Sequence, residues 1–264
     1  MEQNRKALLE QVLFGSDGLD LDLMVTDPEY TTFFSNFAFG EVLDEFSLPE
    51  PEALLAILAS LVGCQGFDVF QRIVEAVSFG PLSGVGLRPV QIREMIYQAT
   101  AYLGVGRVLP FLKAFDHAVQ EAKIRLPIVK SGTVTPETRE AEGSRAQVEI
   151  FGDGMKGYGQ SGPEESRHIR RWLVDNCFGD YYTRKGLSLR EREMVTFCFL
   201  MAQGGCEPQL TAHAQGNMNV GNDRDYLISI LSICIPFIGY PRALNALNCV
   251  ETAAASAAKA VEKN

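Results

Sequence analysis

The chain has 264 residues, 46% of them hydrophobic, and a formal net charge of −9 at pH 7. This length and apolar content allow a sizeable core without disulfide staples and exclude an intrinsically disordered protein. The acidic balance argues against a nucleic-acid partner, because binding a phosphate backbone needs a clustered basic surface, and the densest basic run here is RHIRR at 167–171.

The N-terminal segment gives no sign of export. MEQNRKALLEQVLFGSDG carries charges within its first ten residues and lacks a long apolar stretch followed by a small-residue cleavage site, so we expect no signal peptide. The longest apolar run, YLISILSICIPFIGY at 226–240, is too short to cross a bilayer and predicts a buried helix. Six cysteines without C-x-x-C or metal-type spacing are typical of reduced thiols. We therefore expect a cytoplasmic protein that contacts no membrane and holds no metal ion.

Two long stretches of the chain resemble each other. FGEVLDEFSLPEPEALLAILASLVGCQGFDVFQ from Phe39 matches FGDYYTRKGLSLREREMVTFCFLMAQGGCEPQLTAH from Phe178 with small gaps. Further on, IREMIYQATAYLGVGRVL at 92–109 matches LISILSICIPFIGYPRAL at 227–244 without a gap. Apolar residues recur at helical spacing nearly throughout, and few segments alternate as strands do. The sequence therefore predicts an all-α fold made of two tandem copies of one helical unit.

Helix start signals fall at matching places in the two copies. Each copy contains a Ser-Leu-x-Glu pattern typical of a capping box, Ser47 with Glu50 and Ser188 with Glu191. In the second copy, Asp223 is expected to cap the helix that contains the long apolar run.

A polar segment separates the copies. KSGTVTPETREAEGSRAQ at 130–147 is expected to connect them, with a short helix beginning in its later half. We divide the chain into an N-terminal copy, residues 1–129, and a connector with the C-terminal copy, residues 130–264.

One short stretch, CEPQLTAHAQGNMNVG from Cys206, holds the reactive groups. Its helix is expected to run from about Glu207 to Asn219, and a step of seven residues is almost two turns, so Cys206 and His213 project from the same side. Gln209 lies between them, one turn from each. At the positive N-terminal end of a helix, the dipole and free N–H groups are expected to lower the pKa of the Cys206 thiol.

The preceding helix adds an acid. Glu193 stands where an adjacent antiparallel helix can bring its carboxylate to the imidazole of His213, fix the tautomer and raise the basicity, as in a general base. The non-catalytic alternative is that Cys206 is a packing residue, His213 a core group and Glu193 a first-turn acid favoured by the helix dipole.

The first copy bears on this choice. It keeps an equivalent acid, Glu52, and an equivalent cysteine, Cys64, but has Gln71 where His213 stands. A working site in the second copy and a scaffold in the first are one interpretation of this difference. The other is that the first copy was never selected for chemistry, and both interpretations stay open.

At these residues the chain resembles the carboxymuconolactone decarboxylase family, whose members share an all-helical fold with the alkyl-hydroperoxidase-D-like proteins. The resemblance is strongest over 134–255, through TPETREAEG, IFGDG, CFGDYYTRKGLSLREREMVTF, GCEPQLTAHAQGNMNVG and PFIGYPRALNAL, and weaker over 30–120. It implies that His213 matches the characteristic histidine of the family and Glu193 its helix-start glutamate. It also implies ring-like oligomers, which for a duplicated chain means a homotrimer with six pseudo-equivalent units.

One position departs from the family pattern. The peroxidase-like branch uses a C-x-x-C pair ahead of its histidine, and Gln209 stands at the second of those positions here. Without a resolving cysteine the dithiol cycle cannot run as it does in that branch, although Cys206 alone can still form a sulfenate or a mixed disulfide.

Three functions compete at this point. The first is a cofactor-independent decarboxylase that acts on a small carboxylated lactone or related unsaturated acid, with His213 as general acid/base and Glu193 as its orienting partner. Gln209 and Arg242 are its candidate substrate contacts, although Arg242 fits a surface salt bridge equally well. The second is a thiol-dependent peroxidase of the peroxiredoxin type, acting through Cys206 with a Glu193–His213 relay. The third is a non-catalytic assembly or binding module.

Overall fold

Every regular element in the described part of the chain is a helix, which confirms the predicted all-α fold. The computed structural model describes residues 2–16, 22–45, 48–128 and 130–261. The N-terminal half contains α1 (Glu2–Phe14), α2 (Leu23–Thr26), α3 (Pro28–Asn36), the π-helix η1 (Phe37–Glu41), α4 (Val42–Glu45), α5 (Glu50–Cys64), α6 (Phe67–Ser78), the short 3-10 helix η2 (Ser83–Val85), α7 (Pro89–Leu103) and α8 (Val105–Glu121). The C-terminal half contains α9 (Arg139–Phe151), the 3-10 helices η3 (Asp153–Met155) and η4 (Tyr158–Gln160), α10 (Arg167–Trp172), the π-helix η5 (Leu173–Tyr182), α11 (Leu189–Gln203), α12 (Glu207–Asn219), α13 (Arg224–Ile238) and α14 (Tyr240–Val261).

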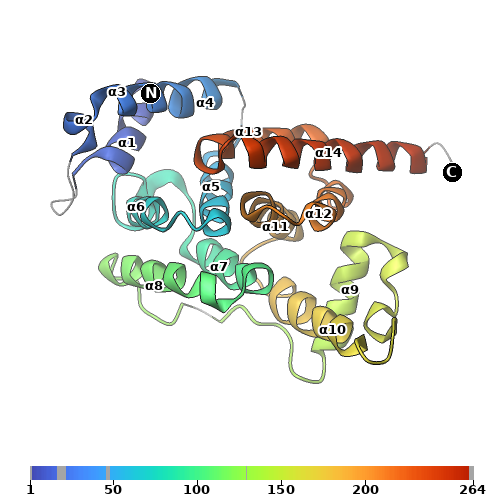
Figure 1. Ribbon diagram of the computed structural model, residues 1–264. Helices are drawn as coiled ribbons and strands as arrows, with labels where there is room; N and C mark the ends of the chain where they lie inside the picture. Colours follow the sequence, from blue (N-terminus) through green and yellow to red (C-terminus); the bar gives the residue numbers. More distant parts are fainter. Residues whose placement is uncertain (1, 17–21, 46–47, 129, 262–264) are drawn as a thin grey trace.

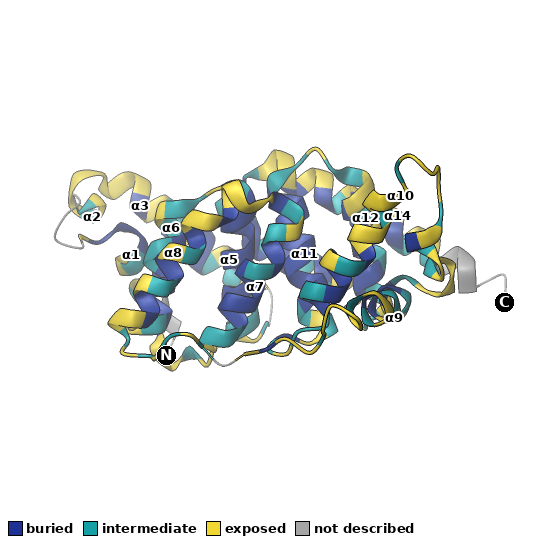
Figure 2. Cartoon of the chain, turned by 90° about the horizontal axis from the view of Figure 1, so that it is seen from below, coloured by how far each residue is buried: buried dark blue, intermediate teal, exposed yellow. Residues whose placement is uncertain are grey.

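Two helices from opposite halves, α5 and α11, pack against each other at the centre of the molecule (Figure 1). Every residue of α5 over 53–63 and of α11 over 192–202 is buried, as expected for helices enclosed on all sides. At their contact a Cβ on Gly63 would stand 2.8 Å from the Cβ of Ala202 and 2.9 Å from the carbonyl oxygen of Phe199. Glycine therefore allows these backbones to approach more closely than a larger residue would. Figure 2 shows buried residues concentrated in this central layer.

Each half also packs one further helix against the central helix of the other half. Helix α7 of the first half packs against α11, and α13 of the second half packs against α5. At the first of these contacts the Gln98 side chain donates to the carbonyl oxygen of Arg192 at 2.9 Å and accepts from its guanidinium at 2.7 Å. One hydrophobic cluster extends through both halves. The predicted division after residue 129 therefore separates two parts of the sequence that share a core, and as a domain boundary it stays a prediction.

The order of helices follows the predicted repeat. A π-helix precedes each series, and the four helices α5 to α8 have 15, 12, 15 and 17 residues, against 15, 13, 15 and 22 for α11 to α14. The third and fourth helices of each series are joined through a glycine of nearly the same conformation, Gly104 with φ 78° and ψ 151° and Gly239 with φ 80° and ψ 158°. These features support two copies of one unit, which stays a prediction.

Several helix boundaries agree with the sequence. Ser188 and Glu191 form the predicted capping box of α11, and Asp223 accepts a hydrogen bond from a backbone N–H in the first turn of α13. The expected helix after the polar connector is present as α9. Ser47 lies outside the described residues, and α5 begins behind Pro49 without a side-chain cap. None of the described helices has the length and apolar character needed to cross a bilayer.

Candidate active site

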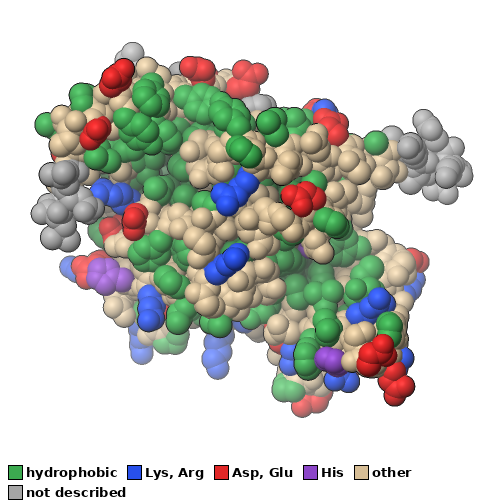
Figure 3. Space-filling model, in the orientation of Figure 1, with side chains coloured by type: hydrophobic (Ala, Val, Ile, Leu, Met, Phe, Trp, Pro, Cys, Tyr) green, Lys and Arg blue, Asp and Glu red, His purple; other side chains and the backbone are tan. Residues whose placement is uncertain are grey.

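A cavity of about 520 Å³ opens beside α12. Figure 3 shows the surface hollowed between the part formed by α12 and the part formed by α9 and α10, with hydrophobic side chains around the hollow. Cys206, Gln209 and His213 of α12 all line this cavity, so the structure brings these three candidate residues together. The remaining lining residues come from α7, α9, η3, η4, η5, α11 and α12: Ala101, Tyr102, Gln147, Phe151, Met155, Tyr158, Leu173, Cys177, Phe178, Leu200, Gln203 and Ala212.

Helices α11 and α12 place an acid against the imidazole. The Glu193 side chain is fully buried, and its Oε2 lies 2.9 Å from Nδ1 of His213. His213 is 8% exposed, through the cavity that it lines. Because Nδ1 is bound to the carboxylate, Nε2 on the other side of the ring is the nitrogen left for chemistry, and it has no hydrogen-bond partner among the described residues. The arrangement is that of a general base held by an acid.

Asn217 locks the two helices that carry this pair. Its side-chain amide donates to the carbonyl oxygen of Glu193 at 2.9 Å and to that of His213 at 2.8 Å. The amide oxygen of Asn217 in turn accepts from the Asn222 side chain at 2.8 Å. All these groups are buried, where satisfied amides fix one geometry.

Gly216, one turn beyond His213, makes room for the carboxylate. A Cβ at this position would stand 2.6 Å from Oε2 of Glu193, and 2.9 Å from both Ile150 and Phe151 of α9. Only glycine leaves space for the Glu193–His213 contact together with the packing of α9.

A network of hydroxyl groups supports the other carboxylate oxygen. The hydroxyl of Tyr182, in η5, donates to Oε1 of Glu193 at 2.8 Å and lies 2.9 Å from Oγ1 of Thr196. Thr196 in turn accepts from the Gln98 amide at 2.8 Å. The hydroxyl of Tyr102, from α7, lies 2.8 Å from that of Tyr182. Burial raises the pKa of both tyrosines well above the ordinary value, so both are neutral phenols.

Sequence reasoning missed Tyr182 and Tyr102, although a signal for them exists. The matched segments pair Tyr182 with Leu43 and Tyr102 with Phe237. In each pair one residue has a hydroxyl and the other only a hydrocarbon side chain, and this difference between matched positions is the pattern that identifies them.

Two rings hold the imidazole from its sides. The rings of Tyr102 and Phe151 meet that of His213 edge to face, with centroids 5.5 and 5.3 Å away. Such contacts restrict rotation of the imidazole without competing for its nitrogens.

The Cys206 thiol differs from the sequence expectation. It lies at the N-terminal end of α12 as predicted, but burial raises its pKa, and the neighbouring Glu207 carboxylate adds to the increase. The thiol also donates to the carbonyl oxygen of Leu200 at 3.4 Å, which favours the protonated form. The expected lowering of the pKa is therefore wrong, because loss of solvent outweighs the helix dipole. Gln203 donates to the sulfur at 3.5 Å, a contact that acts in the opposite direction.

A second thiol faces the cavity. Cys177 lies in η5, and burial raises its pKa to about 12. Its sulfur is 3.7 Å from the hydroxyl of Tyr102. A thiol in this environment is protonated at neutral pH and donates its proton to that hydroxyl.

The two predicted substrate contacts lie in different places. Gln209 is on the cavity, one turn from Cys206 and from His213. Arg242 is an exposed residue of α14 outside the cavity lining, and its side chain lies beside Gly204. Among the residues that the structure describes, no lysine or arginine lines the cavity.

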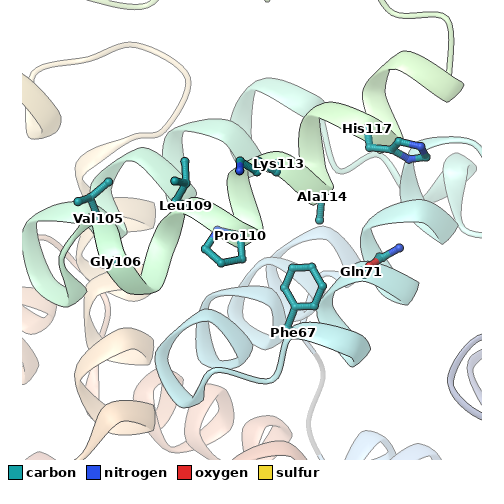
Figure 4. A pocket seen from close by; sticks show the side chains of 9 residues that line it. All are labelled: Phe67, Gln71, Val105, Gly106, Leu109, Pro110, Lys113, Ala114 and His117. Carbon is teal, nitrogen blue, oxygen red and sulfur yellow. The ribbon is translucent and has the colours of Figure 1, made fainter.

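The equivalents in the first half do not share a site. Gln71 is hydrogen-bonded to Glu75 and lines a separate open groove of about 590 Å³ between α6 and α8 (Figure 4). The Cys64 thiol lies against backbone carbonyl oxygens, and Glu52 is hydrogen-bonded to Tyr226. The part of the chain that the structure describes contains no group of three or more His, Cys, Asp or Glu side chains arranged to bind a metal ion.

Comparison with known proteins locates the region of the site. Residues 168–252 match the sequence profile of the Carboxymuconolactone decarboxylase family, and this span includes Glu193 and His213. The fold is similar to a crystal structure from Burkholderia xenovorans LB400, described provisionally as a gamma-carboxymuconolactone decarboxylase subunit, with a TM-score of 0.54. The chains are 15% identical, and the similarity covers 96% of this chain and 98% of the other, which shows a shared fold. A comparison with curated proteins gives no match.

Proposed function

We propose that this member of the carboxymuconolactone decarboxylase family is a cofactor-independent enzyme in which His213 transfers a proton to or from a small carboxylated lactone or related unsaturated acid. The observation that carries the proposal is the 2.9 Å contact between Nδ1 of His213 and buried Glu193, which leaves Nε2 for a substrate in the cavity. A histidine oriented in this way is a strong candidate for general acid/base chemistry.

The proton transfer follows from this geometry. A substrate carboxylate leaves as CO₂, and the electron pair of the broken C–C bond moves into the conjugated carbonyl to give an enolate. Protonated Nε2 of His213 then gives its proton to carbon, and the neutral ring regains a proton from water. While the ring is protonated, Glu193 stabilises its positive charge.

The cavity limits where positive charge can come from. Because none of the described lining residues is a lysine or an arginine, protonated His213 is the cation among them that can face a carboxylate or an enolate. Gln147, Gln203 and Gln209 add amide donors around the cavity. The proposal therefore assigns Gln209 a substrate contact and leaves Arg242 without one.

Turnover of a substrate panel tests the proposal. Small lactone carboxylates and unsaturated acids are incubated with the wild type, and CO₂ release is measured. We expect His213→Gln to lower kcat by about 10²–10⁴-fold, the usual contribution of a general acid/base, and Glu193→Gln to lower it as well. Cys206→Ser, on the same cavity, is the matched control and should retain activity within a few-fold. Full activity in His213→Gln would contradict the proposal.

The thiol-dependent peroxidase has weaker support. Cys206 has a raised pKa and no hydrogen bond to His213, and the second thiol on the cavity, Cys177, is held as a donor to Tyr102. Hydroperoxide consumption that requires an external thiol and is lost in Cys206→Ser would favour this alternative. Absence of both activities, with tight binding of a small molecule in the cavity, would favour a non-catalytic binding module.

The homotrimer stays a further proposal. Large hydrophobic side chains are exposed on α3 and α14, where Phe33 is 59% exposed and Tyr240 and Leu244 are each 57% exposed. Exposed apolar groups of this size are typical of interaction surfaces. Light scattering after size exclusion should give three times the mass of the chain, and a monomer would contradict the proposal.

A further inference from the structure

The hydrogen bonds around Glu193 have a defined direction. An ionised carboxylate only accepts, so the single hydroxyl proton of Tyr182 points to Oε1 of Glu193. The Tyr182 oxygen must then accept from its two other neighbours, Thr196 and Tyr102. Thr196 is free to donate because its own oxygen accepts from the Gln98 amide.

The same direction continues to the wall of the cavity. Since Tyr102 donates to Tyr182, its oxygen is an acceptor, and the Cys177 thiol donates to it. In the series of hydrogen bonds from Cys177 through Tyr102 and Tyr182, each donated proton therefore points toward Glu193. Tyr102 belongs to α7 of the first half, whereas Tyr182 and Glu193 belong to the second, so the support for the acid crosses between the halves.

We propose that Tyr182 and Tyr102 are positioning residues that keep Glu193 ionised and thereby hold His213 as the Nδ1–H tautomer, with the lone pair of Nε2 facing the cavity. The inference deepens the role proposed for His213 and rests on it. Neither tyrosine needs to contact the substrate, because both act through the carboxylate. A hydrogen bond to a charged group is stronger than one between neutral groups, so Tyr182 carries most of the effect and Tyr102 reinforces it.

The groups around the pair come from five packed elements. Helix α7 supplies Tyr102, η5 supplies Tyr182 and Cys177, α11 supplies Arg192, and α12 supplies Cys206. Arg192 is held by Gln98, the carbonyl oxygen of Arg184 and the Glu94 carboxylate, so its charge is engaged away from Glu193. Helix α9 contributes the uncharged side chains of Ile150 and Phe151. Glu193 is therefore the one acid among these side chains. The hydroxyl groups of Tyr182 and Tyr102 are the hydrogen-bonding groups that support it.

Titration of His213 by nuclear magnetic resonance tests the inference without any substrate. The chain has three histidines, and His213→Gln assigns the signal of His213 in ¹⁵N-histidine-labelled protein. In the wild type we expect the neutral ring of His213 to be the Nδ1–H tautomer. Tyr182→Phe removes a donor from the carboxylate, so the acid–imidazole pair takes up its proton at higher pH, by about one pH unit or roughly tenfold in proton affinity.

Two outer variants sharpen the result. Tyr102→Phe and Thr196→Val each remove one donor to Tyr182 and should move the midpoint in the same direction by less. Tyr158→Phe is the matched control, because Tyr158 lines the same cavity but stacks with Arg170 and is outside the hydroxyl chain. Its midpoint should equal that of the wild type.

The outcomes separate this inference from the proposed function. An unchanged or lower midpoint in Tyr182→Phe, with the thermal transition of the wild type retained, overturns the inference. If Tyr182→Phe does not fold, an unchanged midpoint in folded Tyr102→Phe overturns it equally. Absence of turnover in the wild type would remove the proposed reaction but would leave the tautomer and its dependence on Tyr182 measurable.

Discussion

Matching helices of the two halves border an open cavity in one place and a nearly filled space in the other. Around His213 of the second half, Cys177 and Phe178, together with Tyr102 of the first half, line a cavity of about 520 Å³. At the matching place beside α1, Ala38 and Phe39 of the first half, together with Phe237 of the second half, line a space of only about 20 Å³; the sequence pairs these residues with Cys177, Phe178 and Tyr102 in that order. Leu9 and Leu13 of α1 pack into that space together with Leu43, Ile57 and Ile233.

The cavity and the filled space differ in a few side chains and not in the arrangement of their helices. Where the cavity has the hydroxyls of Tyr182 and Tyr102, the small space beside α1 has the hydrocarbon side chains of Leu43 and Phe237. A buried carboxylate without such donors is costly, so the acid that matches Glu193 is not fully buried in the first half, and hydrophobic side chains fill the space. Glu52 is accordingly only partly buried and pairs with Tyr226. One arrangement of helices can thus surround either a cavity with the Glu193–His213 pair or a space filled by hydrophobic side chains.

The largest expected effect concerns how the halves are joined. Glu94 of α7 is fully buried and binds Arg184 at 2.7 Å, with Arg192 at 3.5 Å. The polar contacts described between α5 and α13 include no ion pair: Ser60 with Cys234 at 3.1 Å, Cys64 with the carbonyl oxygen of Phe237 at 3.8 Å, and Glu52 with Tyr226. Glu94→Ala leaves buried guanidinium charge uncompensated and should lower the free energy of unfolding by about 3–5 kcal/mol. Ser60→Ala should cost about 1 kcal/mol or less. Urea unfolding of both variants measures the contrast, and equal losses would contradict it.

A medium effect is expected at Gly216. Replacing a helical glycine by alanine normally favours the helix, but here the new Cβ meets Oε2 of Glu193 at 2.6 Å. Gly216→Ala should lower the free energy of unfolding by about 1–3 kcal/mol, as overpacking does, and displace Glu193 from His213. Gly106→Ala in α8 of the first half is the control, since no atom lies within 4 Å of its added Cβ, and it should stabilise by up to about 1 kcal/mol. Thermal unfolding and the His213 signal measure both changes.

A smaller effect is expected at the two matched thiols, Cys206 and Cys64, which should behave alike. Burial raises the pKa of Cys206 and also that of Cys64, so the thiolate fraction of each at neutral pH is below that of free cysteine, falling about tenfold for each unit of pKa. Alkylation of both, followed by peptide mass spectrometry, should be slow at neutral pH and accelerate only in the alkaline range. His213→Ala should leave the rate at Cys206 unchanged. Fast alkylation of Cys206 below neutral pH that depends on His213 would favour the thiol-dependent peroxidase over the decarboxylase.

The smallest effect is expected from restoring the missing histidine. In Gln71→His the new ring faces the open groove between α6 and α8, far from a buried acid of the Glu193 kind. We expect no additional turnover and stability within about 0.5 kcal/mol of the wild type, as for other surface changes. A gain of activity would show that the first half retains more of the site than its filled space indicates.

The part of this site that local spacing determines could be predicted from the sequence. The helix from Glu207 to Asn219, its common face for Cys206 and His213, and the nearby Glu193 all follow from periodicity and capping signals within one helical hairpin. The fold class follows from the same periodicity over the whole chain.

The rest depends on packing between distant segments. Tyr102 reaches the site from α7 because α7 packs against α11, which no local pattern of the sequence indicates. The pKa of Cys206 depends on how far the thiol is desolvated, and helix position alone gave the wrong sign. Arg242 lies in a matched motif, yet in the structure it is an exposed residue of α14 beside Gly204 and is not among the residues that line the cavity.

The glycine contact between α5 and α11 also has a consequence for synthesis of the chain. Gly63 and Phe199 lie in opposite halves, so the centre of the core forms only when both halves have left the ribosome. Contacts between residues so distant in sequence slow folding, and the exposed apolar face of α5 is prone to aggregation until α11 and α13 cover it. The N-terminal half, produced by itself, would leave that face of α5 uncovered, because α11 and α13 both belong to the C-terminal half.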